Sequence, residues 1–230
     1  MPNGNTTLHE VLTAVFQVRE IDGRPELCVL LWRRALDPEA GAWSLPGGLL
    51  GDNEDMTTSA RRQLAEKVDV REVAHLEQLS VFSAPQRVPG VRLIASTFLG
   101  LVPLDSDPDI PSDTAWYPVT TLPRTAFDHG IVVTHARTRL AAKLSYTNIA
   151  FALAPAEFTM STLREIYCAA LGYQVDATNL QRVLGRRGVL VATGATAPPG
   201  PAGGRPPALY RFAESRLRVT DEFAALRPPT

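Results

Sequence analysis

The sequence predicts an α/β/α sandwich over residues 1–150, followed by a small winged helix-turn-helix over residues 151–230. Three observations point to this. Strand-like runs alternate with two helical patterns in the first part, whereas the second part reads helix, turn, helix, strand, loop, strand. From residue 151 onward the sequence contains nine Arg, no Lys and six acidic residues, which gives a net charge of +3. Residues 1–150 contain 14 basic and 18 acidic residues, which gives a net charge of −4. The second part is therefore the candidate nucleic-acid reader.

The first part opens with two apolar runs, Leu8–Val18 and Glu26–Arg34, on either side of the turn residues Asp22-Gly23. This is the pattern of a β-hairpin. Later segments rich in β-branched and aromatic residues predict more strands, and segments with apolar residues three or four apart predict helices. The expected strands are Leu76–Phe82, Val91–Pro103 and Thr114–Val119, and the expected helices are Met56–Val68 and Phe127–Tyr146.

The segment Thr147–Phe158 is apolar and lacks Gly and Ser, so we expect a packed connector between the domains instead of a flexible linker. Beyond it, Thr159 or Ser161 is a candidate N-cap and Gly172 a stop signal for a helix, and Asp176 or Thr178 is a candidate cap for the next helix. The expected elements are helices Ser161–Leu171 and Asp176–Arg187, strands Val189–Thr193 and Ala208–Phe212, and a Gly/Pro-rich loop Gly194–Pro206.

A Gly-rich loop and the first helix follow Trp43-Ser44-Leu45-Pro46 and cover Gly47–Val70. Their spacing resembles the Nudix box, G-x5-E-x7-R-E-U-x-E-E-x-G-U, where U is aliphatic. The box residues present are Gly48, Glu54, Arg62, Leu64, Glu66 and Val70. Three positions depart from it, because Gln63 and Lys67 stand where glutamates belong and Asp69 replaces the glycine.

The departures change the chemistry of one helix face, since residues 63, 66 and 67 are three or four positions apart. In the family this face carries three carboxylates that hold Mg²⁺. Here it reads Gln, Glu, Lys, so the charge changes from −3 to 0 (0, −1, +1). We therefore expect no catalytic residues, no required cofactor and no metal beyond a weak relic site at Glu54 and Glu66. Lys67 is a candidate replacement for the metal charge near a pyrophosphate.

The whole chain is similar to the Nudix-related transcriptional regulators of NAD metabolism, the NrtR family. Besides the degenerate box, the stretches that carry the resemblance are Ala126-Phe127-Asp128-His129, Tyr146–Leu153 and Gly203–Phe212. The resemblance implies a homodimeric repressor of NAD biosynthesis or salvage genes. Its partners would be double-stranded operator DNA and a nucleotide effector, ADP-ribose or a relative of it.

The candidate effector residues are those of the box and of the strand facing it. They are Arg33, Arg34, Trp43, Gly47, Gly48, Glu54, Arg62, Glu66 and Lys67. Arginine forks suit pyrophosphate, although Arg33 and Arg34 also fit a solvated strand end. Arg62 is expected to orient Glu54 or Glu66, and Phe82 and Arg92 are further possible cleft residues.

The candidate DNA-binding residues lie on the exposed side of the second helix and in the wing. They are Thr178, Asn179, Gln181, Arg182, Arg186, Arg187 and Arg205. Asn, Gln and Arg can form paired hydrogen bonds with base edges, and Arg205 at a Gly-rich loop tip suits a minor groove or a phosphate. A solvated amphipathic helix would have a similar composition. For His129, a helix-capping role or an interdomain contact is favoured over catalysis.

Two other functions fit parts of the sequence. A residual Nudix pyrophosphatase could use Glu54, Glu66 and a nearby carboxylate such as Asp52 or Asp55, and a constitutive DNA-binding protein would use the first domain only to dimerise. No apolar run is long enough for a membrane span, and the two cysteines, Cys28 and Cys168, suit a reducing compartment. We expect a cytoplasmic, nucleoid-associated protein.

Overall fold

The computed structural model describes residues 7–199 and 206–221. Its backbone contacts divide the chain into two compact units. Of the described residues, the first unit takes 7–17, 28–102 and 107–138, and the second takes 18–27, 103–106 and those from 139 onward. Each unit is described by itself below.

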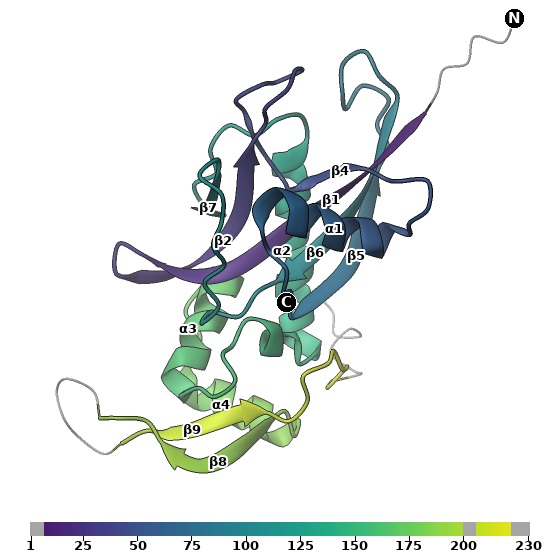
Figure 1. Ribbon diagram of the computed structural model, residues 1–230. Helices are drawn as coiled ribbons and strands as arrows, with labels where there is room; N and C mark the ends of the chain where they lie inside the picture. Colours follow the sequence, from purple (N-terminus) through teal and green to yellow (C-terminus); the bar gives the residue numbers. More distant parts are fainter. Residues whose placement is uncertain (1–6, 200–205, 222–230) are drawn as a thin grey trace, which may run out of the picture. The chain divides into compact units, whose positions relative to one another are not determined.

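A mixed sheet forms the middle of the first unit (Figure 1). Its strand order is β3-β2-β1-β6-β5, with β4 also paired to β1 and β7 to β2. The long central strand β1 runs parallel to β6 and antiparallel to β4. The strands are β1 (Leu8–Ile21), β2 (Arg24–Arg33), β3 (Trp43–Ser44), β4 (Gly47–Leu49), β5 (His75–Phe82), β6 (Leu93–Leu101) and β7 (Thr114–Pro118).

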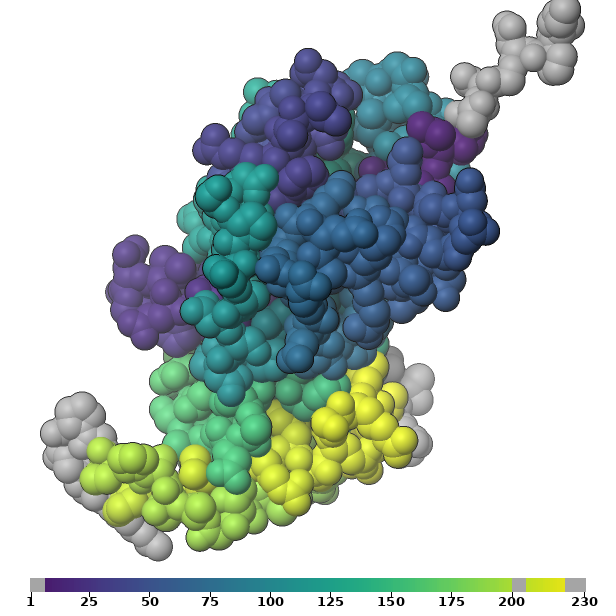
Figure 2. Space-filling model, viewed as in Figure 1, coloured from purple at the N-terminus to yellow at the C-terminus, as the bar shows by residue number. Residues whose placement is uncertain are grey.

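Two helices cover the sheet of the first unit. Helix α1 (Met56–Val68) crosses in front of the strands in Figure 1, and the start of α2 (His129–Tyr146) lies behind them. The Asp55 carboxylate accepts a hydrogen bond from the Thr58 N–H and caps α1, which ends at Asp69 in a left-handed conformation (φ 52°). The outer side of α1, blue in Figure 2, carries exposed residues such as Thr58 and Arg61.

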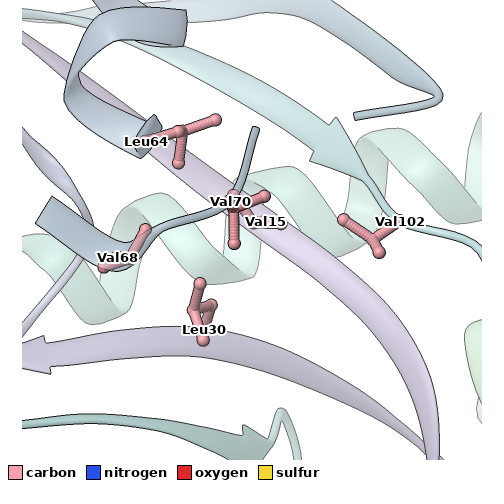
Figure 3. Close-up of a cluster of buried hydrophobic side chains, with 6 residues drawn as sticks. All are labelled: Val15, Leu30, Leu64, Val68, Val70 and Val102. Atoms are coloured by element: carbon pink, nitrogen blue, oxygen red, sulfur yellow. The ribbon is translucent and has the colours of Figure 1, made fainter. Parts of the chain in front are cut away.

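The inner side of α1 packs onto the sheet. Leu64 and Val68 of the helix meet Val15 of β1 and Leu30 of β2, and all four side chains are completely buried (Figure 3). Val70 and Val102 complete this cluster, and Trp32 and Trp116 pack at its edge. At about 1.5–3 kcal/mol for each fully buried aliphatic side chain, this cluster fixes the position of the helix on which the candidate cleft depends.

The second unit contains the winged-helix elements. They are α3 (Met160–Leu171), α4 (Ala177–Arg186), β8 (Leu190–Thr196) and β9 (Ala208–Phe212). Thr159 caps α3, Gly172 ends it with φ 80°, and Asp176 caps α4. Strands β8 and β9 pair antiparallel, and Phe158 before α3 forms a bridge with Tyr210 of β9. The two helices and the wing strands therefore form one folded module.

The expected connector is packed within the second unit. It contains a short 3-10 helix, η1 (Ile149–Ala152), and Ile149, Ala150 and Leu153 are completely buried. The Asn148 amide Nδ2 donates to the Arg216 carbonyl (2.9 Å), and its Oδ1 accepts from the Arg218 N–H (2.7 Å). The buried Asn148 therefore fastens this segment to the chain after the wing.

The observed elements follow the predicted order. Helix α1 has the predicted bounds, Met56–Val68, and β9 has the predicted bounds, Ala208–Phe212. The second predicted helix begins two residues later than expected, at His129, because Phe127 adopts a left-handed conformation (φ 49°) that cannot continue into a helix. In the described parts of the chain, no helix is long and apolar enough to cross a membrane.

Candidate functional site

The glycine pair of the box places its loop directly on the sheet. Gly47 and Gly48 in β4 pair with Leu12 and Val11 of β1. A Cβ added to Gly47 would lie 2.3 Å from the Val11 carbonyl oxygen, and one added to Gly48 would lie 2.7 Å from the Gln63 amide. At Gly47 only glycine allows so close an approach to the β1 backbone, whereas the neighbour of Gly48 is the end of the Gln63 side chain. Gly47 therefore holds the loop against β1.

Arg62 holds both remaining carboxylates of the box. Its Nε and Nη2 donate to the two oxygens of Glu54 (2.8 and 2.5 Å), and its Nη1 donates to Glu66 (3.1 Å). The Arg62 hydrogen bonds, with a backbone N–H from Gly51, lower the pKa of Glu54 to about 2, and the pKa of Arg62 is raised by the same bonds. These contacts agree with the prediction that Arg62 orients Glu54 or Glu66.

Gln63 and Lys67 face the loop, where the family pattern has glutamates. Gln63 is only 4% exposed. Its amide fits best with the nitrogen donating to the Gly47 carbonyl (3.3 Å) and the oxygen accepting from Arg62. The Lys67 ammonium donates to the same carbonyl at 2.5 Å and lies 4.7 Å from the centre of the Trp32 ring. Burial, followed by the charges of Arg34 and Arg62, lowers the pKa of Lys67.

A cavity of about 190 Å³ lies beside Lys67. It brings together four of the predicted effector residues, Arg34, Gly47, Gly48 and Lys67. The sequence interpretation missed the other lining residues, which are Glu10, Leu12, Trp32, Ala35, Leu36, Leu45 and His129. The cavity therefore has aromatic and aliphatic walls and two cationic side chains, with one carboxylate, that of Glu10.

His129 is a buried member of this cavity wall. It is 2% exposed, and its Nδ1 accepts a hydrogen bond from the Leu45 N–H (3.0 Å). Burial lowers the pKa of His129 to about 3, so the ring is neutral. Our expectation of a capping or interdomain role was wrong, because this bond joins the ring to the loop before β4, within the first unit.

A buried arginine fixes the residues next to His129. The Arg87 side chain is 1% exposed and lies between Glu10 (2.5 Å) and Asp128 (2.7 Å). Burial opposes the charge of Arg87, but the hydrogen bonds to Asp128 and Glu10 outweigh it and raise its pKa. Burial, partly offset by Arg87, raises the pKa of Glu10. Arg87 therefore joins β1, which carries Glu10, to the start of α2.

Two other predicted effector residues, Arg33 and Trp43, are not among the residues that line this cavity. The Arg33 guanidinium lies 4.9 Å from the centre of the Trp43 ring, and Arg34 lies 4.9 Å from that of Phe127. Trp43 lines a wider, open hollow of about 600 Å³ together with Glu39 and Arg124. Trp43 therefore lines a different hollow from the smaller cavity. Arg34 lines the smaller cavity, and its sequence neighbour Arg33 contacts Trp43.

Two further residues considered for the cleft have local contacts instead. Phe82 packs edge-on against His135 (5.3 Å between ring centres). Arg92 donates to the Ser83 carbonyl (2.8 Å). Phe82 is the last residue of β5, and Arg92 directly precedes β6.

The predicted DNA-binding helix, α4, presents most of its candidate residues to solvent. Thr178, Asn179, Gln181, Arg182 and Arg186 are exposed, whereas Leu180 and Leu184 are buried. Arg182 donates to Asn179 (2.6 Å), and Gln181 donates to the Tyr210 hydroxyl of β9 (3.1 Å). The helix and the wing are therefore linked at the exposed surface.

Arg187 and Arg205 differ from the other candidates on this surface. Arg187 is half-buried and forms an ion pair with Asp221 (2.7 Å), so its guanidinium is already occupied. Arg205 lies outside the described residues, as does the Gly203-Gly204 pair before it.

Two signals in the sequence could have found the missed residues. Asp128-His129 belongs to a stretch noted for its resemblance, and Trp32 precedes the predicted Arg33. Glu10 and Arg87 carry no such signal, because 77 positions separate them and only the fold brings them together. Among the residues that the structure describes, no three or more His, Cys, Asp or Glu side chains are grouped to hold a metal ion.

Comparison with known proteins identifies the fold of the first part. The NUDIX domain model matches residues 9–135, which is more than half of the chain. The chain belongs to the NUDIX family. A second model, the NrtR DNA-binding winged helix domain, matches residues 150–212. The predicted combination of an α/β NUDIX fold with a C-terminal winged helix is therefore confirmed.

Several known proteins are similar to this chain. An ADPR responsive transcriptional repressor, NtrR, of Acinetobacter baylyi is 29% identical over 195 residues, covering 82% of this chain and 76% of the relative. Shewanella oneidensis NrtR matches with a TM-score of 0.77 at 27% identity, covering 90% of this chain and 94% of its own, and its complex with a 27mer DNA gives 0.76. The NUDIX domain of that protein complexed with ADP ribose matches 61% of this chain, at 29% identity and a TM-score of 0.51.

Proposed function

We propose that this protein is a DNA-binding transcriptional repressor of NAD biosynthesis or salvage genes. Its NUDIX domain binds ADP-ribose or a related nucleotide and does not hydrolyse it. Support comes from Shewanella oneidensis NrtR, which was solved in complex with a 27mer DNA and whose NUDIX domain was solved with ADP ribose. The observation that carries the non-enzymatic part is Lys67, whose ammonium lies on the loop carbonyl of Gly47 where the box has a carboxylate.

The chemistry of the cavity suits a phosphorylated ligand. Arg34 and Lys67 both line it, and Trp32 and Leu36 offer apolar surface. A pyrophosphate brings negative charge, which two cations in a partly buried cavity stabilise more than water-exposed cations would. The cavity thus supplies from the chain itself the positive charge that a metal ion supplies in the hydrolases.

The residues on the box helix do not fit Mg²⁺. This ion requires several anionic or neutral oxygen ligands in near-octahedral geometry. Both oxygens of Glu54 accept from Arg62, and Glu66 shares that guanidinium. Gln63 is neutral and buried, and Lys67 would repel a cation. We therefore propose no metal, no catalytic residue and no hydrolytic step for this domain.

The role of Lys67 can be tested by restoring the family pattern. The double variant Gln63→Glu, Lys67→Glu should bind ADP-ribose only when Mg²⁺ is added, because two new carboxylates would join Glu66 on the same helix face. Titration calorimetry with EDTA and with Mg²⁺ distinguishes the two conditions. Metal-free binding at the wild-type affinity in this variant would rule out the exchange of metal for lysine.

We assign DNA reading to the exposed side of α4 and to the wing. Thr178, Asn179, Gln181, Arg182 and Arg186 would contact the major groove or its phosphates, and Arg205 would contact the minor groove or a phosphate. The ion pair of Arg187 with Asp221 supports a positioning role for Arg187 instead of a base contact. The proposed domains are residues 1–150 for the effector and 151–230 for DNA.

We also propose that the protein acts as a homodimer on a pseudopalindromic operator. Two winged helices related by a twofold axis would meet half-sites about one helical turn, or a multiple of it, apart. Sedimentation of the protein with and without operator DNA tests this.

The deciding experiment is binding of the purified protein to DNA upstream of NAD-biosynthesis genes from its own genome, with and without ADP-ribose, at stated salt. Specific binding that changes with ADP-ribose is the expected result. Specific binding that ignores ADP-ribose would leave a DNA-binding protein without this effector. Absence of specific binding, together with Mg²⁺-dependent turnover of ADP-ribose or NADH, would overturn the proposal in favour of a pyrophosphatase.

A further inference from the structure

One ring nitrogen of His129 has no protein partner among the described residues. The Nδ1 atom accepts from the Leu45 N–H at 3.0 Å, so the neutral ring carries its proton on Nε2. This Nε2 is buried and makes no hydrogen bond with the described part of the chain. His129 also lines the cavity of about 190 Å³ that contains Lys67 and Arg34. The ring that carries this buried N–H donor therefore forms part of the wall of the candidate cleft.

The surroundings of His129 keep this donor in one orientation. The neighbouring Asp128 is held by two hydrogen bonds from Arg87 (2.9 and 2.7 Å). Phe127 packs against the imidazole with the ring centres 5.9 Å apart. Buried polar groups in folded proteins almost always find a partner, and an unpaired donor in a rigid wall requires an explanation. The cavity that the ring lines is the place from which an acceptor can approach it.

The cavity defines the kind of acceptor. Lys67 and Arg34 line this space, and its one carboxylate, that of Glu10, is paired with Arg87. An oxygen that carries negative charge is therefore favoured over a neutral hydroxyl. At about 190 Å³ the cavity is smaller than the roughly 300–1,000 Å³ of a site for a whole drug-sized ligand. It therefore holds one polar group of a larger molecule.

We infer that the Nε2–H of His129 donates a hydrogen bond to a phosphoryl oxygen of the bound nucleotide, beside Lys67. This inference rests on the proposed function, which places a nucleotide effector in the NUDIX cleft. It adds a neutral, directional donor to the two cations. Because a neutral imidazole carries a single N–H, the bond fixes where the phosphoryl group lies, whereas the cations mainly attract it.

Two substitutions of His129 separate the two ring nitrogens. In His129→Asn the amide oxygen lies near the former Nδ1 and can still accept from Leu45, but no group replaces Nε2–H. In His129→Gln the amide nitrogen reaches the former Nε2 position, but the acceptor for Leu45 is lost. His129→Asn should weaken ADP-ribose binding about tenfold with a melting temperature near that of the wild type. His129→Gln should melt earlier and keep most of the affinity.

The tautomer and the contact can also be observed in the unchanged protein. A long-range ¹H–¹⁵N spectrum should show the proton of His129 on Nε2, and addition of ADP-ribose should shift this nitrogen. Phosphorus spectra of bound ADP-ribose should differ between the wild type and His129→Asn at one phosphate. The nitrogen spectrum of the wild type applies even if a variant fails to fold.

Each outcome decides a separate point. A proton on Nδ1, or equal ADP-ribose affinity and equal phosphorus shifts in the wild type and His129→Asn, would overturn the inference and leave the effector function intact. No binding of ADP-ribose to the wild-type protein would overturn both. Weakened binding in His129→Asn with a shifted phosphorus resonance would establish the contact.

Discussion

Lys67 is the residue whose replacement should weaken effector binding most directly. We predict that Lys67→Met weakens ADP-ribose binding by about tenfold or more, since a charge-assisted contact is worth about 1.5–3 kcal/mol. Met loses the ammonium above the Trp32 ring but keeps an unbranched side chain that can pack there through its thioether, so the fold should persist. Titration calorimetry of the wild type and the variant measures the difference.

The chain offers a matched control for this change. Lys143 in α2 is the only other lysine of the sequence, and it lies outside the cavity lining. Lys143→Met should leave the affinity for ADP-ribose unchanged. Equal losses in both variants would show that general charge, and not the position of Lys67, attracts the nucleotide.

His129 should make the first unit sensitive to acid. Its pKa is about 3 when folded, below the ordinary value of 6.5, so below about pH 6.5 the unfolded chain binds a proton that the folded chain does not. The free energy of unfolding should therefore fall by about 1.4 kcal/mol per pH unit as the pH drops from about 6.5 towards 5.

Urea unfolding followed by tryptophan fluorescence can measure this loss, because Trp32, Trp43 and Trp116 all lie in the first unit. His129→Asn should remove this part of the pH dependence, while the carboxylates titrate in both proteins. The same pH dependence in the variant would show that other groups cause it.

Lys67 and His129 also show what sequence can reveal about a site. Lys67 stands out because it breaks a known spacing, so its chemical meaning is visible without coordinates. His129 is 84 positions from its partner Leu45, and its bond depends on how the start of α2 meets the loop before β4. Local patterns carry no information about such a distant pair.

At the scale of elements, the close packing of β4 on β1 should tolerate no side chain at Gly47. We predict that Gly47→Ala lowers the free energy of unfolding of the first unit by about 1–3 kcal/mol, because the added Cβ would lie 2.3 Å from the backbone oxygen of Val11. Urea unfolding measures the loss. Affinity for ADP-ribose should fall as well, since Gly47 lines the cavity.

A second glycine provides the contrast. Gly185 lies in α4, and a Cβ added there would meet nothing within 4 Å beyond the backbone of its own helix. Gly185→Ala should raise the stability of the second unit by about 0.5–1 kcal/mol, because alanine loses less backbone entropy in a helix. If Gly47→Ala left the free energy of unfolding unchanged, this would contradict the close approach of Gly47 to the Val11 carbonyl oxygen.

The contact between α4 and the wing should influence DNA binding. Tyr210→Phe removes the acceptor of Gln181 and frees that amide on the surface that we propose binds DNA. We predict a loss of specific DNA affinity of a few-fold, in keeping with one hydrogen bond of about 0.5–1.5 kcal/mol. Fluorescence anisotropy with labelled operator DNA measures it.

The matched control is Tyr173→Phe, which removes a hydroxyl from an exposed tyrosine in the turn before α4. It should bind DNA like the wild type. If Tyr210→Phe also does so, the hydroxyl does not position Gln181 for DNA.

Elements with strong periodicity were predictable, and their connections were not. The apolar spacing and capping residues of α1, α3 and α4 placed these helices to within about a residue or two, as helix signals usually allow. The loop carrying Arg87 has no such pattern, yet its guanidinium joins Glu10 of β1 to Asp128 beside α2. Tertiary charge pairing, not local preference, decides where that residue lies.

For the whole molecule, the effector and the DNA must influence each other equally. If saturating ADP-ribose changes operator affinity by some factor, saturating operator must change ADP-ribose affinity by the same factor, about 5- to 150-fold for typical coupling. Titrating each ligand in the presence of the other measures both factors. Unequal factors would show that the protein changes its assembly state during the titration.

The position of Lys67 has a consequence for chemical labelling. Amines react with acylating reagents only when uncharged, and the lowered pKa of Lys67 increases that fraction at neutral pH. With only one other lysine in the sequence, the pattern of modified peptides is simple to read by mass spectrometry. A nucleotide seated on Lys67 would shield it from reagent, so occupancy of the cleft can be followed in cell extracts without knowing the operator.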